Sequence, residues 1–201
     1  NLFPAHVYRS RALATLNGAD ALDQEIAWFM NHGHASLGLI LSAQAALVRG
    51  DKKRAREHIE EGLTKGGKTK ISFLRQAIRC FWQLKDIDAA RRALDLLWAQ
   101  SRSDTALAAE TLQLRASTET RIGDTIRAIE AYERASLLRP SPSIYRRMAL
   151  LELKNGNRDG ALRRLRKAKA RWPHSTLINQ ELKALAKSAA ATAKPKAQTK
   201  D

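Results

Sequence analysis

The stretch Gly123-Asp124-Thr125-Ile126-Arg127-Ala128 decides the fold, because it sets a turn residue, a helix-capping residue and an Ala at fixed spacing. The same order returns three more times along the chain, as Gly50-Asp51 with Ala55, Lys85-Asp86 with Ala90, and Gly156-Asn157 with Ala161. Gly accepts the left-handed conformation that ends a helix, and Asp or Asn caps the helix that follows. Each phrase therefore predicts a corner between two helices.

The spacing of the corners predicts a repeat architecture. The turn residues stand at positions 50, 85, 123 and 156, so the phrases are 35, 38 and 33 residues apart. Such a period is typical of helical hairpins stacked one on the next. Four residues after each Ala comes a larger apolar residue that is expected to fill the groove between helices: Ile59, Leu94, Tyr132 and Leu165. We expect an all-α superhelical solenoid of stacked antiparallel hairpins.

These residues resemble the tetratricopeptide repeat (TPR) family over residues 36–173. The last two repeats carry the resemblance most regularly, through Gly123, Ala128, Tyr132, Ala135 and Pro140 and through Gly156, Ala161, Leu165, Ala168 and Pro173. The second repeat departs from the family pattern, with Lys85 for Gly, Leu97 for Ala and Arg102 for Pro. The resemblance implies about four TPR-like repeats and a protein-protein interaction scaffold or adaptor.

The remaining segments are expected to flank the repeats. Residues 1–35 are interpreted as a degenerate N-terminal helical hairpin, and residues 174–188 as the solvating helix that closes the array. Residues 189–201 are rich in Ala and Lys without apolar periodicity, and they predict a disordered basic tail. Because the chain begins at Asn1 and not at Met, we expect that an upstream segment has been removed.

Charge is distributed unevenly. The chain holds 36 Lys and Arg against 20 Asp and Glu, and residues 141–201 hold fifteen of these bases but only four of the acids. Four of these bases define a predicted basic patch on one helix: Arg163, Arg164, Lys167 and Arg171. The patch is either a solvated face or a site for an anionic partner. Nucleic acid would call for stacking aromatic residues, yet aromatic content is 5% and only Trp172 adjoins the patch.

The first helix of each hairpin is expected to line a concave groove. The predicted groove residues are mostly cationic: Arg75, Arg79, Gln113, Ser117, Arg121, Arg146 and Lys154. Some members of the TPR family hold a terminal carboxylate with a Lys, Asn, Asn, Lys, Arg set. The matching positions here are Arg75, Arg79, Leu114, Ser143 and Arg147, so both Asn residues are missing. The resemblance thus implies an acidic or extended partner segment, and not that terminal clamp.

Catalytic motifs are weak. Residues Gly62 to Thr69 match the phosphate-loop string, but a helical pattern precedes them where such a loop needs a buried strand. His32 and His34 lack the further ligands of a zinc site, and Cys80 is expected to be a core residue. We predict no enzyme, cofactor or metal. The predicted function is a scaffold that binds an acidic segment in a basic groove. The alternative is a nucleic-acid or anionic-polymer binding domain that uses the basic patch.

Overall fold

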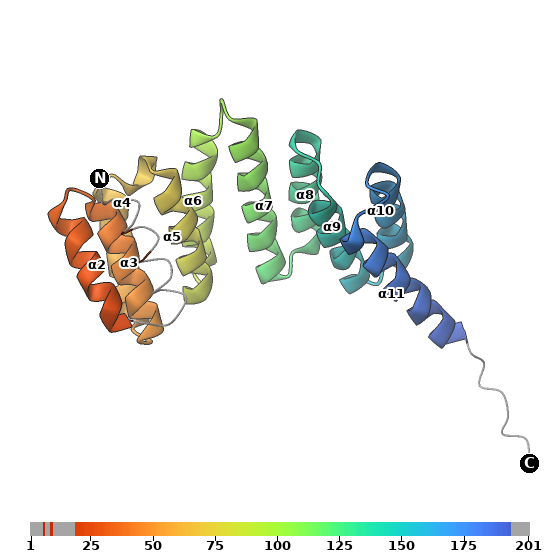
Figure 1. Ribbon diagram of the computed structural model, residues 1–201, viewed down its shortest axis with the longest axis horizontal. Coiled ribbons are helices and arrows are strands. Elements are labelled where there is room, and N and C mark those ends of the chain that lie inside the picture. The colour runs from red at the N-terminus through yellow and green to blue at the C-terminus, as the bar shows by residue number, and fades with distance from the viewer. Residues whose placement is uncertain (1–5, 7–8, 10–18, 194–201) are drawn as a thin grey trace, which may run out of the picture. The chain divides into compact units, whose positions relative to one another are not determined.

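The computed structural model describes residues 6, 9 and 19–193, and every regular element within them is a helix (Figure 1). The chain divides into two compact units, residues 1–104 and 105–201. The described part of the first unit contains α2 (Ala19–Asn31), α3 (Ala35–Val48), α4 (Lys52–Thr64), the 3-10 helix η1 (Gly67–Thr69), α5 (Ile71–Leu84) and α6 (Ile87–Gln100). The second contains α7 (Thr105–Ile122), α8 (Thr125–Leu138), α9 (Pro142–Lys154), α10 (Arg158–Arg171) and α11 (Thr176–Ala193).

All four predicted corners are confirmed. The turn residues have positive φ angles of 80° at Gly50, 58° at Lys85, 92° at Gly123 and 77° at Gly156. The next residue caps the following helix each time, because its side-chain oxygen accepts a hydrogen bond from the backbone N–H three residues later, at 2.9 to 3.0 Å. Lys85 is the only residue other than Gly with positive φ in the described part of the chain.

The spacing after each corner is explained by packing. Ala55, Ala90, Ala128 and Ala161 are all fully buried, and so are Ile59, Leu94 and Leu165 four residues further on. A methyl group at the Ala position lets the two helices of a hairpin approach closely, while the larger residue fills the space beside it. The hairpins that result are α3 with α4, α5 with α6, α7 with α8, and α9 with α10.

In the first unit, α2 packs on α3, and α3 also contacts α5. Leu22 and Phe29 of α2 are buried with Leu41 and Ala45 of α3. Of the predicted N-terminal hairpin, residues 1–35, the structure describes residues 6, 9 and 19–35, and α2 lies within this segment. Among the described residues, then, the first unit consists of two corner-built hairpins with α2 packed on the first of them.

In the second unit, α8 contacts α9, and α11 packs against both α9 and α10. Ile178 and Leu185 of α11 are buried in the core of this unit, whereas Leu177 is 41% exposed. The helix runs to Ala193, past the predicted bound at 188, so residues 189–193 are helical and not part of a tail. Residues 194–201 lie outside the described part.

The fold class is the one expected, with hairpins stacked in each unit and no strand among the described residues. No helix in the described part of the chain is both long enough and apolar enough to cross a bilayer.

Candidate interaction surfaces

The predicted groove residues are divided between the two units, with Arg75 and Arg79 in the first and the other five in the second. In the first unit, Arg75 and Arg79 lie on α5. Arg79 is exposed, and its Nη1 lies 3.5 Å from the side-chain oxygen of Gln76, which also accepts from Gln44 of α3 at 3.4 Å. This part of α5 therefore forms a polar strip with α3, made of amides and a guanidinium.

In the second unit, the predicted groove residue Ser117 belongs to a hydrogen-bonded cluster that joins three helices. Ser117 of α7 donates to the Gln113 carbonyl at 2.9 Å, and its oxygen lies 3.3 Å from the hydroxyl of Tyr132 on α8. The Arg147 guanidinium of α9 donates to the Tyr132 hydroxyl at 3.1 Å and approaches Ser117 Oγ at 3.4 Å. Since the Ser117 proton goes to the carbonyl, the Tyr132 hydroxyl donates to Ser117 and accepts from Arg147.

Arg147 is held in place by this cluster. Its guanidinium carbon lies 6.0 Å from the centre of the Tyr132 ring, and Tyr132 itself is 3% exposed. A buried ring with few rotamers offers a rigid platform for a cation. Arg147 is exposed, and among the described residues no carboxylate lies within ion-pair distance of its guanidinium. Two hydroxyl groups and the Tyr132 ring therefore position this cation.

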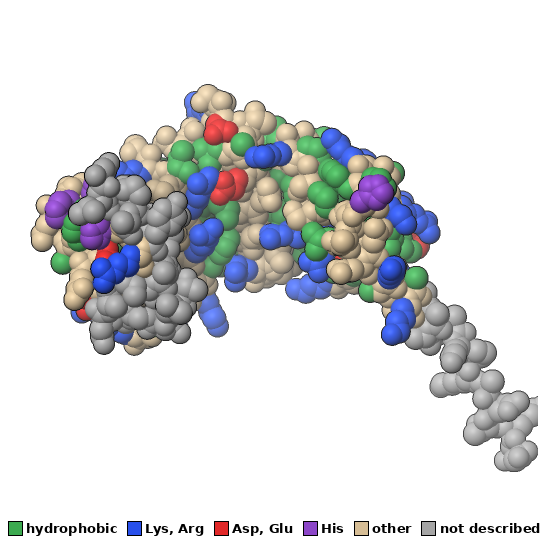
Figure 2. Space-filling model, in the orientation of Figure 1, with side chains coloured by type: hydrophobic (Ala, Val, Ile, Leu, Met, Phe, Trp, Pro, Cys, Tyr) green, Lys and Arg blue, Asp and Glu red, His purple; other side chains and the backbone are tan. Residues whose placement is uncertain are grey.

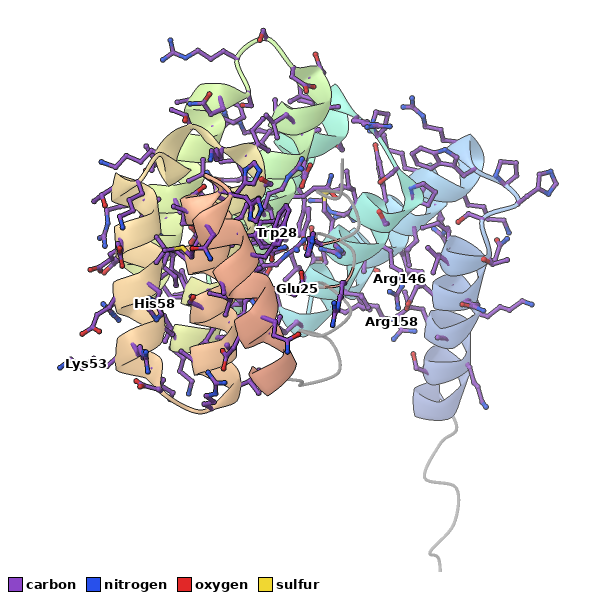
Figure 3. All side chains as sticks on the ribbon, turned by 60° about the vertical axis from the view of Figure 1, so that its left-hand side comes forward. Glu25, Trp28, Lys53, His58, Arg146 and Arg158 are labelled. Carbon is purple, nitrogen blue, oxygen red and sulfur yellow. The ribbon has the colours of Figure 1, made fainter. Side chains whose placement is uncertain are left out.

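Arg146 differs from its predicted role. Its Nε lies 2.6 Å from Glu181 Oε1 of α11, and the glutamate side chain is 18% exposed. In Figure 3, Arg146 and Arg158 extend from α9 and α10 toward α11, where Arg158 donates to the Leu185 carbonyl. The closing helix thus already supplies a carboxylate to Arg146, which was expected to bind a carboxylate of a partner. Arg121 and Lys154 lie exposed in the last turns of α7 and α9.

The basic patch is only partly uncompensated, because Arg164 has carboxylate partners within the unit. Arg164 is half-buried and forms ion pairs with Glu133 of α8 at 2.8 Å and with Glu152 of α9 at 2.9 Å. Charge spacing within α10 could not reveal partners that come from two other helices. Arg163, Lys167 and Arg171 are exposed, and the Arg171 guanidinium carbon lies 5.2 Å from the centre of the Trp172 ring.

The phosphate-loop string does not form a phosphate site. It begins inside α4, and a helix thus stands where a buried strand is required. Gly67 is buried against the end of α4, where an added Cβ would lie 2.4 Å from the Gly62 carbonyl and 2.7 Å from Phe73. The glycines therefore serve close packing between α4 and α5. Lys68 is exposed, and Lys70 extends to Ser36 of α3 at 2.9 Å.

Cys80 is a core residue, as predicted. It is 2% exposed within α5, and this burial raises the pKa of its thiol from 9.0 to about 12, against a smaller lowering by Arg79. The thiol is therefore neutral at physiological pH, and a neutral buried thiol is a poor nucleophile.

The sequence interpretation missed a carboxylate buried in the first unit. Glu25 of α2 is 1% exposed, and its two oxygens lie 2.6 Å from His6 Nδ1 and 3.3 Å from Arg9 Nε. The neighbouring Trp28 stacks on His6 at 3.8 Å and on His32 at 4.3 Å between ring centres. Figure 3 labels Glu25 and Trp28 on α2. The signal was available, since Glu25 shares a helical face with Leu22 and Phe29. Because Glu25 is paired inside the unit, it serves structure.

Comparisons with known proteins agree with this architecture. No protein-family model and no curated protein matches the chain. Among solved structures it is similar to MamA from Desulfovibrio magneticus RS-1, with a TM-score of 0.60 and 15% identity over 86% of this chain and 97% of that one. It is similar to PilF of Pseudomonas aeruginosa, with a TM-score of 0.60 and 14% identity over 90% and 96% of the two chains.

A third similar structure is YrrB, described as a TPR protein with an unusual peptide-binding site. The TM-score is 0.57 at 16% identity, and the match covers 89% of this chain and 90% of that one. At such identities the likeness concerns the fold alone. With the four capped corners and the buried Ala positions, it shows that this chain has a TPR-like helical repeat fold.

Proposed function

We propose that this protein is a protein-protein interaction scaffold whose second unit binds an extended, acidic segment of a partner. The binding face would be formed by α7 and α9, the first helices of the two hairpins in this unit. Its polar residues are Gln113 and Ser117 of α7 and Arg147 of α9, with Arg121 and Lys154 in the last turns of the two helices.

The proposal rests on one observation: Arg147 is held by two hydroxyl groups and has donors left for a ligand. A guanidinium has five N–H donors, and here one nitrogen contacts two hydroxyl groups. The remaining donors can bind a carboxylate in the two-pronged geometry that Arg favours. Because Tyr132 and Ser117 fix the guanidinium beforehand, little side-chain entropy is lost on binding. Arg146, in contrast, already has a carboxylate partner, Glu181.

An extended segment fits this face better than a folded surface does. Gln113 lies one helical turn before Ser117 on α7, so its side-chain amide belongs to the same helical face as the hydroxyl that contacts Arg147. A peptide in an extended conformation exposes its own backbone N–H and C=O groups, which such side chains can bind. Charge then selects for acidic residues and speeds the encounter.

Catalysis is less well supported. The two reactive motifs that the sequence offers are not assembled: the phosphate-loop string is a packed connection between helices, and the Cys80 thiol is buried and neutral. The polyanion alternative is weakened because Arg164 is neutralised by two carboxylates and because Trp172 packs edge-to-face on Tyr145 at 5.7 Å. We therefore favour binding of protein segments over binding of nucleic acid.

Fluorescence anisotropy with a defined probe tests the proposal. The probe is a labelled peptide of about ten residues that carries one central Asp between Pro residues, which keep it extended. Arg147→Gln should weaken binding about tenfold, the loss expected for one charge-assisted contact. Tyr132→Phe should weaken it less, because it removes the hydroxyl that positions Arg147 but keeps the ring.

Arg163→Gln is the matched control, since it removes the same charge from an exposed site in the same unit. A probe with Asn in place of Asp should bind weakly to every variant. Equal losses for Arg147→Gln and Arg163→Gln would show that net charge alone attracts the probe, and the proposed face would be wrong.

A further inference from the structure

A second surface of the molecule lies between α10 and α11. A cavity of about 450 Å³, open to solvent, is lined by Lys169 and Pro173 from the end of α10 and the turn after it, and by Asn179, Leu182, Lys183 and Ala186 of α11. Leu182 is half-buried, and Asn179 donates to the Pro173 carbonyl at 3.1 Å, which fixes the turn. We call this the terminal groove. None of its residues belongs to the binding face around Arg147.

The terminal groove combines an apolar floor with cationic sides. Pro173, Leu182 and Ala186 provide the apolar surface, while Lys169 and Lys183 are exposed. In the described part of the chain neither lysine has a carboxylate within ion-pair distance. This arrangement fits an occupant that is apolar on one side and carries acids beside it.

The surroundings add positive charge and almost no negative charge. Residues 158–193 contain nine Lys or Arg against two acids, Asp159 and Glu181, and Glu181 is paired with Arg146. Figure 2 shows Lys and Arg side chains gathered over the end formed by α10 and α11, with few Asp or Glu side chains visible there. An anionic occupant is therefore attracted from a distance as well as at contact.

We infer that the terminal groove is a second docking site, which takes an amphipathic acidic helix from a partner protein. Helix-in-groove recognition places apolar residues at i and i+4 on the floor, and acids beside them reach the two lysines. This chain cannot supply the occupant from its own C-terminal residues, because Lys194, Lys196 and Lys200 give residues 194–201 the same sign of charge as the groove.

Two other anionic partners fit the groove less well. Nucleic acid binding needs aromatic rings on which bases stack, and Trp172 already packs against Tyr145 on one side and lies under Arg171. A bilayer surface is flat, so it engages apolar residues that protrude and leaves recessed ones such as Leu182 uncovered. The experiment therefore also measures binding to a single-stranded oligonucleotide and to vesicles containing anionic lipid.

The probe is a labelled amphipathic peptide of about 15 residues, long enough to form a helix, with Leu residues flanked by Glu. It is titrated into the full chain and followed by anisotropy. The double variant Lys169→Glu with Lys183→Glu should weaken binding at least tenfold. The matched double variant Arg163→Glu with Lys167→Glu makes the same charge change on the outer face of α10, and it should weaken binding less than about threefold because it acts only through the long-range field.

Further measurements use a changed probe, the Arg147→Gln variant and two other anionic ligands. Replacing the probe's Leu residues by Gln should weaken binding about tenfold, because the apolar floor is then not covered. Arg147→Gln should leave binding of this probe unchanged, so failure here is distinct from failure of the proposed function. Equal losses in the two double variants would overturn the inference, as would tighter binding to a single-stranded oligonucleotide or to vesicles containing anionic lipid.

Discussion

α4 in the first unit and α10 in the second are both the second helix of a hairpin, yet the balance of acids and bases on their exposed faces differs. Both follow a capped corner and both bury the Ala of the repeated phrase. Glu61 of α4 pairs with Lys65, the residue after the helix, at 2.6 Å, and Arg56 of α4 pairs with Asp86, which caps α6, at 2.7 Å. On α10, Arg164 is paired, while Arg163 and Lys167 are exposed and have no carboxylate within ion-pair distance among the described residues.

The same helix packing can therefore support exposed faces with different balances of acids and bases. Packing is fixed by the small and large apolar residues that the corner places inward, so the outward positions are free to vary. On α4 they mix bases with the acids Glu57, Glu60 and Glu61, and Lys52, Lys53 and Arg54 are exposed as well. In the second unit the outward positions of α10 carry exposed cations such as Arg163 and Lys167. Both binding surfaces that we propose lie in this unit.

The largest effect is expected when the shared packing is broken in both units. Ala55→Leu in α4 and Ala161→Leu in α10 should each lower the free energy of unfolding by about 1 to 3 kcal/mol, because both Ala side chains are fully buried between helices. Urea unfolding followed by circular dichroism measures this. A variant that unfolds at the wild-type midpoint would show that its Ala does not set the approach of the two helices.

A smaller effect should separate paired from unpaired cations on α10. Arg164→Ala should lower the free energy of unfolding by about 1 to 2 kcal/mol, because it leaves the largely buried Glu152 without its charged partner. Arg163→Ala should change it by less than about 0.5 kcal/mol, as is usual for an exposed residue. If the two substitutions cost the same in thermal unfolding, the ion pairs of Arg164 do not contribute to stability.

The corner before α6 should be improved by the residue that the other three corners use. Lys85→Gly should raise the free energy of unfolding by about 1 kcal/mol, because Lys pays a steric cost in the left-handed conformation that Gly avoids. Gly123→Ala in the second unit is the reverse change and should lower stability by a similar amount. Destabilisation by Lys85→Gly would mean that the Lys85 side chain makes a contact worth more than the strain.

The smallest effect is expected for Cys80, whose thiol reactivity measures how often the first unit opens. Its thiol should react with a disulfide reagent at pH 8 only through opening of the unit. Ala55→Leu should therefore speed the reaction more than Ala161→Leu does. Because the pKa is raised from 9.0 to about 12, the stabilisation from the protonated thiol is complete below pH 9 and is lost as pH rises toward 12. Cys80→Ala should remove this part of the pH dependence.

Sequence reasoning predicted the fold well because the corners are local. A turn residue, its capping neighbour and an Ala act within one short segment, so their spacing carries the geometry. Lys85 was placed correctly in the left-handed corner although it is not Gly, since the register of Asp86 and Ala90 around it was intact. The end of α11 was not predicted, because the Ala-rich residues that continue it have no apolar periodicity.

The candidate site was predicted less well because its state depends on contacts between helices. Arg146 and Arg147 are neighbours in sequence, yet one is paired with Glu181 of α11 and the other is held by Tyr132 of α8. Spacing along one helix cannot distinguish them. For the same reason Arg164 was grouped with exposed cations. The terminal groove is formed by the packing of α11 against α10, and no motif in the sequence predicts that packing.

The most direct test of the central claim is a map of where an acidic extended segment binds. Backbone amide signals of the full chain would be followed by NMR during titration with the Asp-containing probe peptide. The account predicts shifts centred on α7 and α9, around Ser117 and Arg147, with little change on α4. Shifts spread evenly over the exposed cations of both units, or centred on α4, would contradict it.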